Sequence, residues 1–168
     1  MRPGTVREKV SSQPRYLEFA DDSPAEVVAV MEALTSSHAG WINFQPAVDV
    51  HDLPPPPSPL FAFLSARGPD VPLATWTPPS APGRRRPDPP MIGLQHGAGT
   101  RAKARLAELG HGVPEGWVVV QDHSRKGLVV AVPPTVAHAQ VVGWLLGAAE
   151  ALSPVPLRNG WRAAVYEG

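Results

Sequence analysis

The hydrophobic pattern of the chain predicts three helices separated by short strands. Apolar residues recur at helical spacing over about 24–37, 100–109 and 135–152. Before the first helix, Ser23 is placed to cap it, Pro24 suits the first turn, and Glu26 would complete a capping box. Thr135 is the expected cap of the third helix. Glycines at 40 and 110 are expected to end the first two helices.

Short apolar or alternating runs predict the strands of one sheet. These runs lie at 15–19, 41–45, 91–95, 117–121, 128–132 and 160–166. A turn around 124–127 joins two of them into the clearest hairpin of the chain. The pattern therefore favours the α+β class, with a mostly antiparallel mixed sheet and about three helices packed on it.

A Gly-Trp pair precedes three of the predicted strands. The pairs are Gly40-Trp41, Gly116-Trp117 and Gly160-Trp161. Each follows a helix and a short linker, which indicates a repeated helix-to-strand connection. We expect each tryptophan to cap the hydrophobic core where its strand begins.

Proline interrupts this pattern in the middle of the chain. Of 22 prolines among 168 residues, 14 lie between positions 46 and 90, so we expect one α+β domain over 1–168 with a proline-rich insert at about 46–90. Within the insert, the runs 60–64 and 71–76 predict a second hairpin, and Pro72 would restrict the latter run to a sheet edge. The stretch 78–90 is expected to be a surface loop dispensable for folding.

Composition narrows the classes of function. The formal net charge is zero and there is no cysteine, which excludes disulfides, thiolate catalysis and cysteine-based metal sites. No uninterrupted apolar run reaches ~18 residues and no secretory signal is recognisable, so we expect a cytoplasmic protein without a membrane span. Twelve arginines against three lysines, with abundant Ala, Gly and Pro, suggest a bacterial source.

Charge is distributed unevenly along the chain. Residues 1–83 carry five basic and nine acidic groups, whereas residues 84–168 carry ten and six. Arg84-Arg85-Arg86 is the one basic run, and no aromatic-interleaved motif or basic helix accompanies it, so nucleic acid is not an expected partner.

The sharpest local motif is Gly97-Ala98-Gly99-Thr100-Arg101-Ala102, which lies between a predicted strand and a predicted helix. It resembles the dinucleotide-binding fingerprint of Rossmann proteins, a resemblance that covers about 30 residues. In that family the glycines let the backbone approach a pyrophosphate at a helix N-terminus. The hairpin that follows departs from a second βαβ unit. Three interpretations stay open: an ordinary glycine turn, a dinucleotide site, or a site for a phosphate-bearing small molecule without the Rossmann fold. The candidate binding residues are Gly97, Gly99, Thr100 and Arg101.

Other candidate residues point to structure rather than catalysis. Asp49, His51 and Asp52 form a short polar cluster, and Asp122-His123-Ser124 contains the residue types of a hydrolytic triad. Three consecutive side chains do not adopt triad geometry unaided, and the histidine spacings match no metal motif. His138 is expected at the edge of the core. Catalytic residues and cofactors stay unknown, and no metal site is predicted.

Two functions follow as hypotheses. The favoured one is a small non-catalytic binding or protein-interaction module. The alternative is an enzyme or ligand-dependent protein that binds a phosphate-bearing molecule at the 97–101 turn. A second apolar stripe on the last helix, centred on Trp144, requires a cover. The proline-rich segment of the same chain could supply it, but a homodimer through that helix is the favoured prediction.

Overall fold

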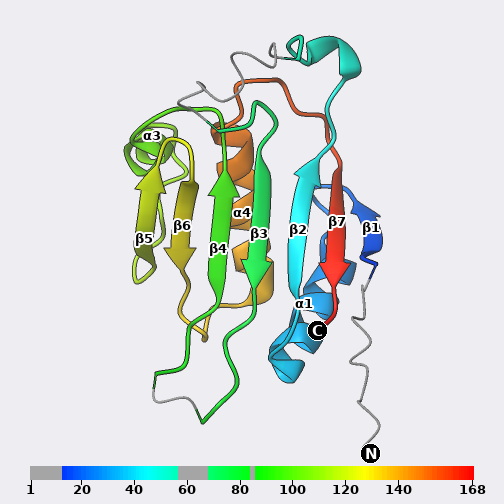
Figure 1. The fold of residues 1–168 in the computed structure, drawn as a ribbon, viewed down its shortest axis with the longest axis vertical. Coiled ribbons are helices and arrows are strands. Elements are labelled where there is room, and N and C mark those ends of the chain that lie inside the picture. Colours follow the sequence, from blue (N-terminus) through cyan, green and yellow to red (C-terminus); the bar gives the residue numbers. More distant parts are fainter. Residues whose placement is uncertain (1–12, 57–67, 84–85) are drawn as a thin grey trace, which may run out of the picture.

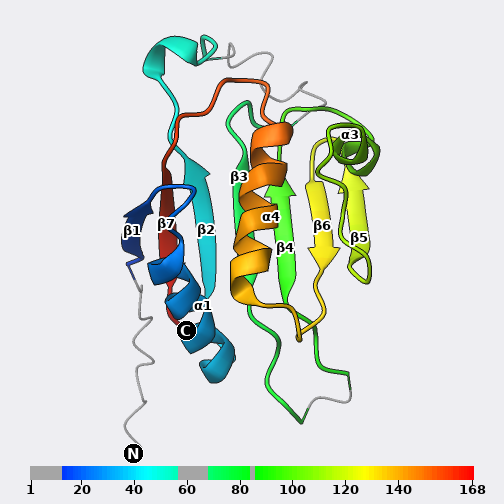
Figure 2. The same ribbon diagram turned by 180° about the vertical axis from the view of Figure 1, so that it is seen from behind.

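The fold is a seven-stranded antiparallel sheet with its helices on one side, so the α+β class is confirmed. The computed structural model describes residues 13–56, 68–83 and 86–168. Figures 1 and 2 show the sheet from its two faces, with α4 across its middle and α1 below it on the same side. The strands are β1 (Arg15–Phe19), β2 (Trp41–Pro46), β3 (Leu73–Thr77), β4 (Met91–Gln95), β5 (Val118–His123), β6 (Gly127–Ala131) and β7 (Trp161–Tyr166). The helices are α1 (Ala25–Ser37), η1 (Val50–Asp52, a 3₁₀ turn), α3 (Ala102–Glu108) and α4 (His138–Ala151).

The strands lie in the order β1-β7-β2-β3-β4-β6-β5, with every neighbouring pair antiparallel. The last strand, β7, is inserted between β1 and β2, so the two ends of the described chain meet in the sheet. β3 is the middle strand, with three strands on each side of it.

The core lies between the sheet and the two longer helices. α1 buries Val27, Met31 and Leu34, and α4 buries Val142 and Leu145. The helices contact each other, and α4 also contacts β3 and β4. α3 packs at the other end of the sheet, against β5 and β6. The remaining buried strand residues face this layer, among them Ile42, Phe44, Trp76, Ile92, Leu94 and Val165.

The central position of β3 corrects the prediction that its run forms a sheet edge. Pro72 would cost a ladder hydrogen bond inside a strand, but β3 begins one residue later, at Leu73. The strand is therefore free to pair on both sides, with β2 and β4. Its predicted hairpin partner, 60–64, lies outside the described residues.

The predicted helix caps also differ from the structure. Pro24 occupies the N-cap position of α1, without a side-chain cap, in place of Ser23. Likewise, α4 begins at His138 rather than after Thr135, because a turn closed by the Val136 amide and the Pro133 carbonyl comes first. Both helices are held by the burial of their apolar faces rather than by side-chain caps.

The Gly-Trp pairs divide into two kinds. Trp117 and Trp161 are buried as expected, with 8% and 5% of their surfaces exposed. Trp41 is 41% exposed and lies on the side of the sheet away from the helices, which corrects its predicted role as a core cap. Side chains alternate across a strand, and Ile42 and Phe44 already take the inward positions of β2.

Candidate functional site

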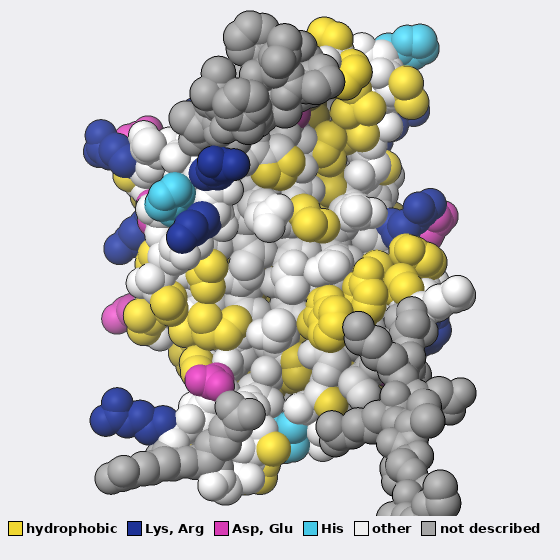
Figure 3. All heavy atoms as spheres, viewed as in Figure 1, with side chains coloured by type: hydrophobic (Ala, Val, Ile, Leu, Met, Phe, Trp, Pro, Cys, Tyr) yellow, Lys and Arg dark blue, Asp and Glu magenta, His cyan; other side chains and the backbone are white. Residues whose placement is uncertain are grey.

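The side of the sheet opposite the helices has no layer of secondary structure over it in the described part of the chain (Figures 1 and 3). We call it the open face and define it by the outward-facing residues of the seven strands. The strand registers align these residues in three rows that cross the sheet. An antiparallel sheet can face water on one side, but such a face is ordinarily rich in polar and charged residues.

The first row, here the apolar row, lies where β2 begins and β7 ends. Its members are Tyr166, Trp41, Thr77, Met91, Ala131 and Val118. The rings of Trp41 and Tyr166 are stacked, with centroids 4.6 Å apart and planes 11° from parallel. Val118, at the other end, is 60% exposed. Figure 3 shows hydrophobic side chains gathered at the lower ends of β2 and β7 and of β5 and β6, and others at the top right near η1.

The middle row carries mostly small, neutral side chains. Its members are Tyr16, Ala164, Asn43, Thr75, Gly93, Val129 and Gln121. The Thr75 hydroxyl donates a hydrogen bond to the Asn43 side-chain oxygen at 2.8 Å. A Cβ atom added to Gly93 would meet nothing within 4 Å. The centre of the open face therefore has room for an additional side chain above Gly93.

The third row, here the polar row, lies at the opposite ends of the same strands. It contains Glu18, Arg162, Gln45, Leu73, Gln95 and His123. Glu18 and Arg162 are the only Asp, Glu, Lys or Arg among the outward positions of the described strands, and they pair with each other at 3.0 Å. Arg162 also lies over the ring of Tyr16, 5.6 Å from its centroid. The whole face thus carries little net charge.

A hollow lies at the corner of the sheet where β1, β2 and β7 meet. Its lining includes Glu18, Gln45, Asn159 and Arg162. Three of these side chains belong to the polar row, so the hollow is continuous with the open face.

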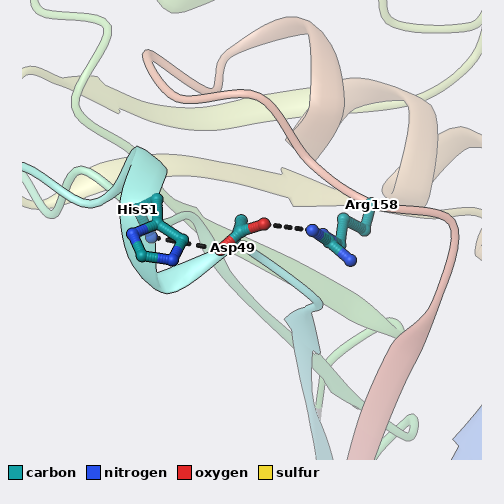
Figure 4. Close-up of polar contacts among 3 residues, drawn as sticks. All are labelled: Asp49, His51 and Arg158. Carbon is teal, nitrogen blue, oxygen red and sulfur yellow. Dashed lines mark hydrogen bonds and ion pairs between the residues drawn. The ribbon is translucent and has the colours of Figure 1, made fainter.

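Asp49 and Arg158 fasten the loops beside this hollow (Figure 4). The Asp49 carboxylate accepts a hydrogen bond from the His51 amide and another from the Arg158 guanidinium. The pKa of Asp49 is lowered, chiefly by the bond from the His51 amide and less by Arg158, although desolvation opposes the shift. Because the cluster closes the η1 turn and ties it to the segment before β7, its role is structural.

A carboxylate side chain occupies the start of α3, the helix that follows the 97–101 turn. The amides of Ala102 and Lys103, at the start of α3, donate to the two carboxylate oxygens of Asp122 at 3.1 and 3.0 Å. Asp122 comes from β5 and serves as the anion that a helix N-terminus attracts. Arg101 and Thr100 line a shallow surface beside the helix, together with Arg105 and Glu108.

Packing and backbone conformation explain why glycines occupy this turn. A Cβ on Gly97 would lie 2.8 Å from the Pro69 carbonyl oxygen, so close packing of two loops requires glycine there. Gly99 has a φ of +86°, a conformation that favours glycine. Arg101 also has a positive φ, +64°, and occupies the N-cap position of α3. The structure thus explains the motif by packing and turn geometry.

His96, next to this turn, is the buried polar residue of the described core. Its side chain is 0% exposed, and neither ring nitrogen has a hydrogen-bond partner among the described residues. Burial lowers the pKa of His96, the nearby Asp122 carboxylate opposes the shift, and Arg105 adds to it. A neutral imidazole is therefore favoured inside the fold.

The remaining candidates are structural contacts. Asp122 and His123 point to different partners: the His123 Nδ1 atom accepts from the amides of Arg125 and Lys126 at 3.1 and 3.2 Å. His138 shares a 3.1 Å hydrogen bond with the Thr35 hydroxyl and packs edge-on against Trp76. His138 thus lies at the core edge with a partner.

The Trp144 stripe of α4 is covered by the chain itself. The Trp144 indole donates to the carbonyls of His111 and Gly112, at 3.3 and 3.1 Å. Its ring packs edge-on against Trp117 at 5.3 Å. Val141 and Ala148 of the same stripe are buried. The wide apolar arc of α4 therefore needs no second chain to cover it.

The open face was not predicted from the sequence, because this face carries few reactive side chains. The available signal was the outward half of each strand: apolar or small neutral residues stand where a solvated sheet would carry charges.

Among the described residues, no group of three or more His, Asp or Glu could hold a metal ion, and no helix is long and apolar enough to cross a membrane. Comparisons of this chain with family models, with curated proteins and with solved structures find no match.

Proposed function

We propose that this protein is a non-catalytic protein-interaction module whose working surface is the open face. The observation that carries the proposal is the contrast between the extent of this face and its near absence of charge. A solvated sheet face without a partner is expected to hold more polar and charged residues. Exposed aromatic residues such as Tyr16 and Trp41 are typical of protein interfaces.

The shape of the face favours a protein partner over a small molecule. Small-molecule sites are concave and enclose most of the ligand, whereas the small side chains of the middle row leave open space above Gly93. The stacked pair of Trp41 and Tyr166 offers a rigid aromatic surface of the kind that anchors interfaces. We propose the cytoplasm as the location of this module, on the grounds of sequence alone.

The alternative function, binding of a phosphate-bearing molecule at the 97–101 turn, has a specific requirement. The ligand would have to displace the Asp122 carboxylate from the two amides of α3, or use Arg101 and Arg105 alone. A thermal-shift titration with inorganic phosphate tests this directly, with Arg101→Ala as the variant. A stabilisation that Arg101→Ala abolishes would favour this function over the interaction module.

The interaction module is tested by a substitution that places a charge at the centre of the open face. Gly93→Arg puts a long cation where a Cβ has open space, so the fold should be retained. Glu32→Arg is the control, because Glu32 is exposed on α1, on the other side of the sheet. We expect tagged wild type and Glu32→Arg to retain the same protein partner in cell extract, other copies of this chain included, and Gly93→Arg to lose it. Equal retention by all three proteins would contradict the proposal.

A further inference from the structure

We propose that the partner seated on the open face is a second copy of this chain, related to the first by a two-fold axis that runs along β3. This inference rests on the proposed function and names the occupant of its surface. It is carried by the symmetry of the strand order, the match of side chains across that symmetry, the placement of charge and the area of the face.

The strand order supplies the symmetry. With β3 in the middle, a two-fold axis along β3 places β2 over β4 of the other copy, β7 over β6, and β1 over β5. Each of the three rows then faces the same row of the second copy, because the axis runs along the strands. A two-fold pair is also the commonest arrangement of soluble homo-oligomers.

In the apolar row, this pairing sets large side chains against smaller ones. Tyr166 of one copy faces Ala131 of the other, and Trp41 faces Met91. The hydrophobic side chains over β2 and β7 and those over β5 and β6 lie at the same end of the strands, on opposite sides of β3 (Figure 3). The group over β2 and β7 of each copy would cover the group over β5 and β6 of the other copy. The two-fold axis makes this contact occur twice. In a single copy, the aromatic and valine side chains of these two groups are exposed to water.

The middle row lets the two sheets approach closely. Thr75 lies on the axis and faces its own equivalent, while Asn43 faces Gly93, which has open space above it. Ala164 faces Val129. Face-to-face sheets pack about 10 Å apart. Small side chains at the centre suit this spacing.

The polar row brings opposite charges together. Glu18 lies at the β1 end of the sheet and would face the β5 end, where the turn after His123 carries Arg125 and Lys126. Figure 3 shows basic and histidine side chains gathered at that end of β5 and β6. Arg162 faces Gly127, a position without a side chain, and remains paired with Glu18. The axis makes each of these contacts twice.

The open face is of the size that a stable pair needs. Seven strands at about 4.8 Å spacing and five residues at about 3.4 Å give a flat area of roughly 550 Å². Two copies together would bury roughly 1,100 Å², which is above the ~1,000 Å² in total that a specific interface should bury.

The first test is the molar mass of the purified protein at micromolar concentration. We expect wild type and Glu32→Arg to have twice the chain mass of 17.9 kDa, and Gly93→Arg to have the single-chain mass with an unchanged circular dichroism spectrum. A single-chain mass for wild type would overturn the self-pairing. The proposed function would survive that result if Gly93→Arg still lost a protein partner from extract, and both would fail if it lost none.

The second test locates the axis and uses the absence of cysteine, since each introduced thiol is then the only one in its chain. The probe is a bifunctional thiol reagent that spans about 10 Å, the distance between packed sheets. Thr75→Cys, on the axis, should cross-link to itself. Gln121→Cys should not, but it should cross-link in a mixture with Tyr16→Cys, which faces it. A dimer in which Gln121→Cys links to itself and mixed pairs do not form would overturn the axis along β3.

Residues of the same chain are the competing occupant of the face. In that case the protein is monomeric, Thr75→Cys forms no cross-link, and its thiol reacts more slowly with a small monofunctional reagent than Glu32→Cys does. This outcome overturns the second-copy proposal. Fast reaction of the Thr75→Cys thiol in a monomer overturns it equally, because the face is then open to water.

Discussion

The two faces of the sheet are built from the same strands and differ in almost every physical property. On β2, Ile42 and Phe44 point toward the helices and are fully buried, while Trp41 and Asn43 point the other way. The covered face is filled by large aliphatic and aromatic side chains against α1 and α4. The open face has aromatic and apolar groups at one end, small neutral residues in the middle and one ion pair. The fold needs the first face, and a partner would need the second.

This difference separates stability from binding along each strand. Alternation places neighbouring residues on opposite faces, so adjacent substitutions should have effects of different size and kind. The largest change in stability is expected on the covered face, and the largest change in association on the open one.

Trp76→Ala should have the largest effect on stability. Trp76 is 0% exposed on the middle strand and packs against His138 of α4, so its loss should cost about 3–5 kcal/mol of unfolding free energy. Its neighbour Thr77 faces outward, and Thr77→Ala should cost at most about 1 kcal/mol. Urea denaturation of both variants measures the two losses of unfolding free energy. Equal losses would contradict this prediction.

His96 should make the stability of the covered face depend on pH. Burial lowers its pKa in the folded state below the ordinary value of 6.5, so the unfolded chain binds the proton first as the pH falls. The free energy of unfolding should therefore not change with the titration of His96 above pH 6.5, and it should decrease as the pH falls below 6.5. His96→Leu should flatten the dependence of the denaturation midpoint on pH between 6.5 and 5. An unchanged slope would show that His96 is not the group responsible.

Asp122→Ala tests the carboxylate that holds the start of α3. Removal of an acceptor for two helix amides should cost about 0.5–2 kcal/mol, while Asp122→Asn, which keeps one acceptor oxygen, should cost less. Thermal denaturation ranks the two variants. If inorganic phosphate stabilises Asp122→Ala more than wild type, the vacated amides bind anions; no difference would leave Asp122 as a purely structural cap.

Trp41→Ala should affect stability less than association. The stacked contact with Tyr166 contributes about 0.5–1.5 kcal/mol beyond area burial, and Trp41 is already 41% exposed. The loss of stability measured in urea should stay well below that of Trp76→Ala, whereas the molar mass of the proposed dimer should fall toward the single-chain value. If Trp41→Ala lost as much unfolding free energy as Trp76→Ala, Trp41 would be part of the hydrophobic core and this prediction would be wrong.

The smallest effect is expected from the proline-rich loop between β3 and β4. Within 78–90, the Ser80 and Asp88 amides make the hydrogen bonds that close the loop, and the His38 ring nitrogen Nδ1 donates to the Pro79 carbonyl. Replacement of 81–87 by a Gly/Ser linker of equal length keeps these contacts, so the melting temperature should be nearly unchanged. Loss of soluble protein would show that the replaced residues matter for folding.

The sequence by itself determined most of the local elements. Hydrophobic periodicity located all seven strands of the described sheet and its three α-helices, because burial of one face leaves a local signature. The β5–β6 hairpin was equally visible, since glycine and polar residues mark its turn. Boundaries and caps were less accurate, as Ser23 and Thr135 show, because tertiary burial holds α1 and α4 without them.

Only the tertiary structure decided which strands are neighbours and what the motifs do. Nothing local states that β7 lies between β1 and β2, or that β3 is central despite Pro72, since strand pairing is a long-range choice. The helix start after the 97–101 turn offers free amides as judged from the sequence, but in the fold Asp122 of β5 accepts hydrogen bonds from two of them, those of Ala102 and Lys103. Trp41 looked like a core residue until alternation and its neighbours turned it outward. The open face exists because the two long helices of the described chain lie on one side of a seven-stranded sheet, and no single strand carries that information.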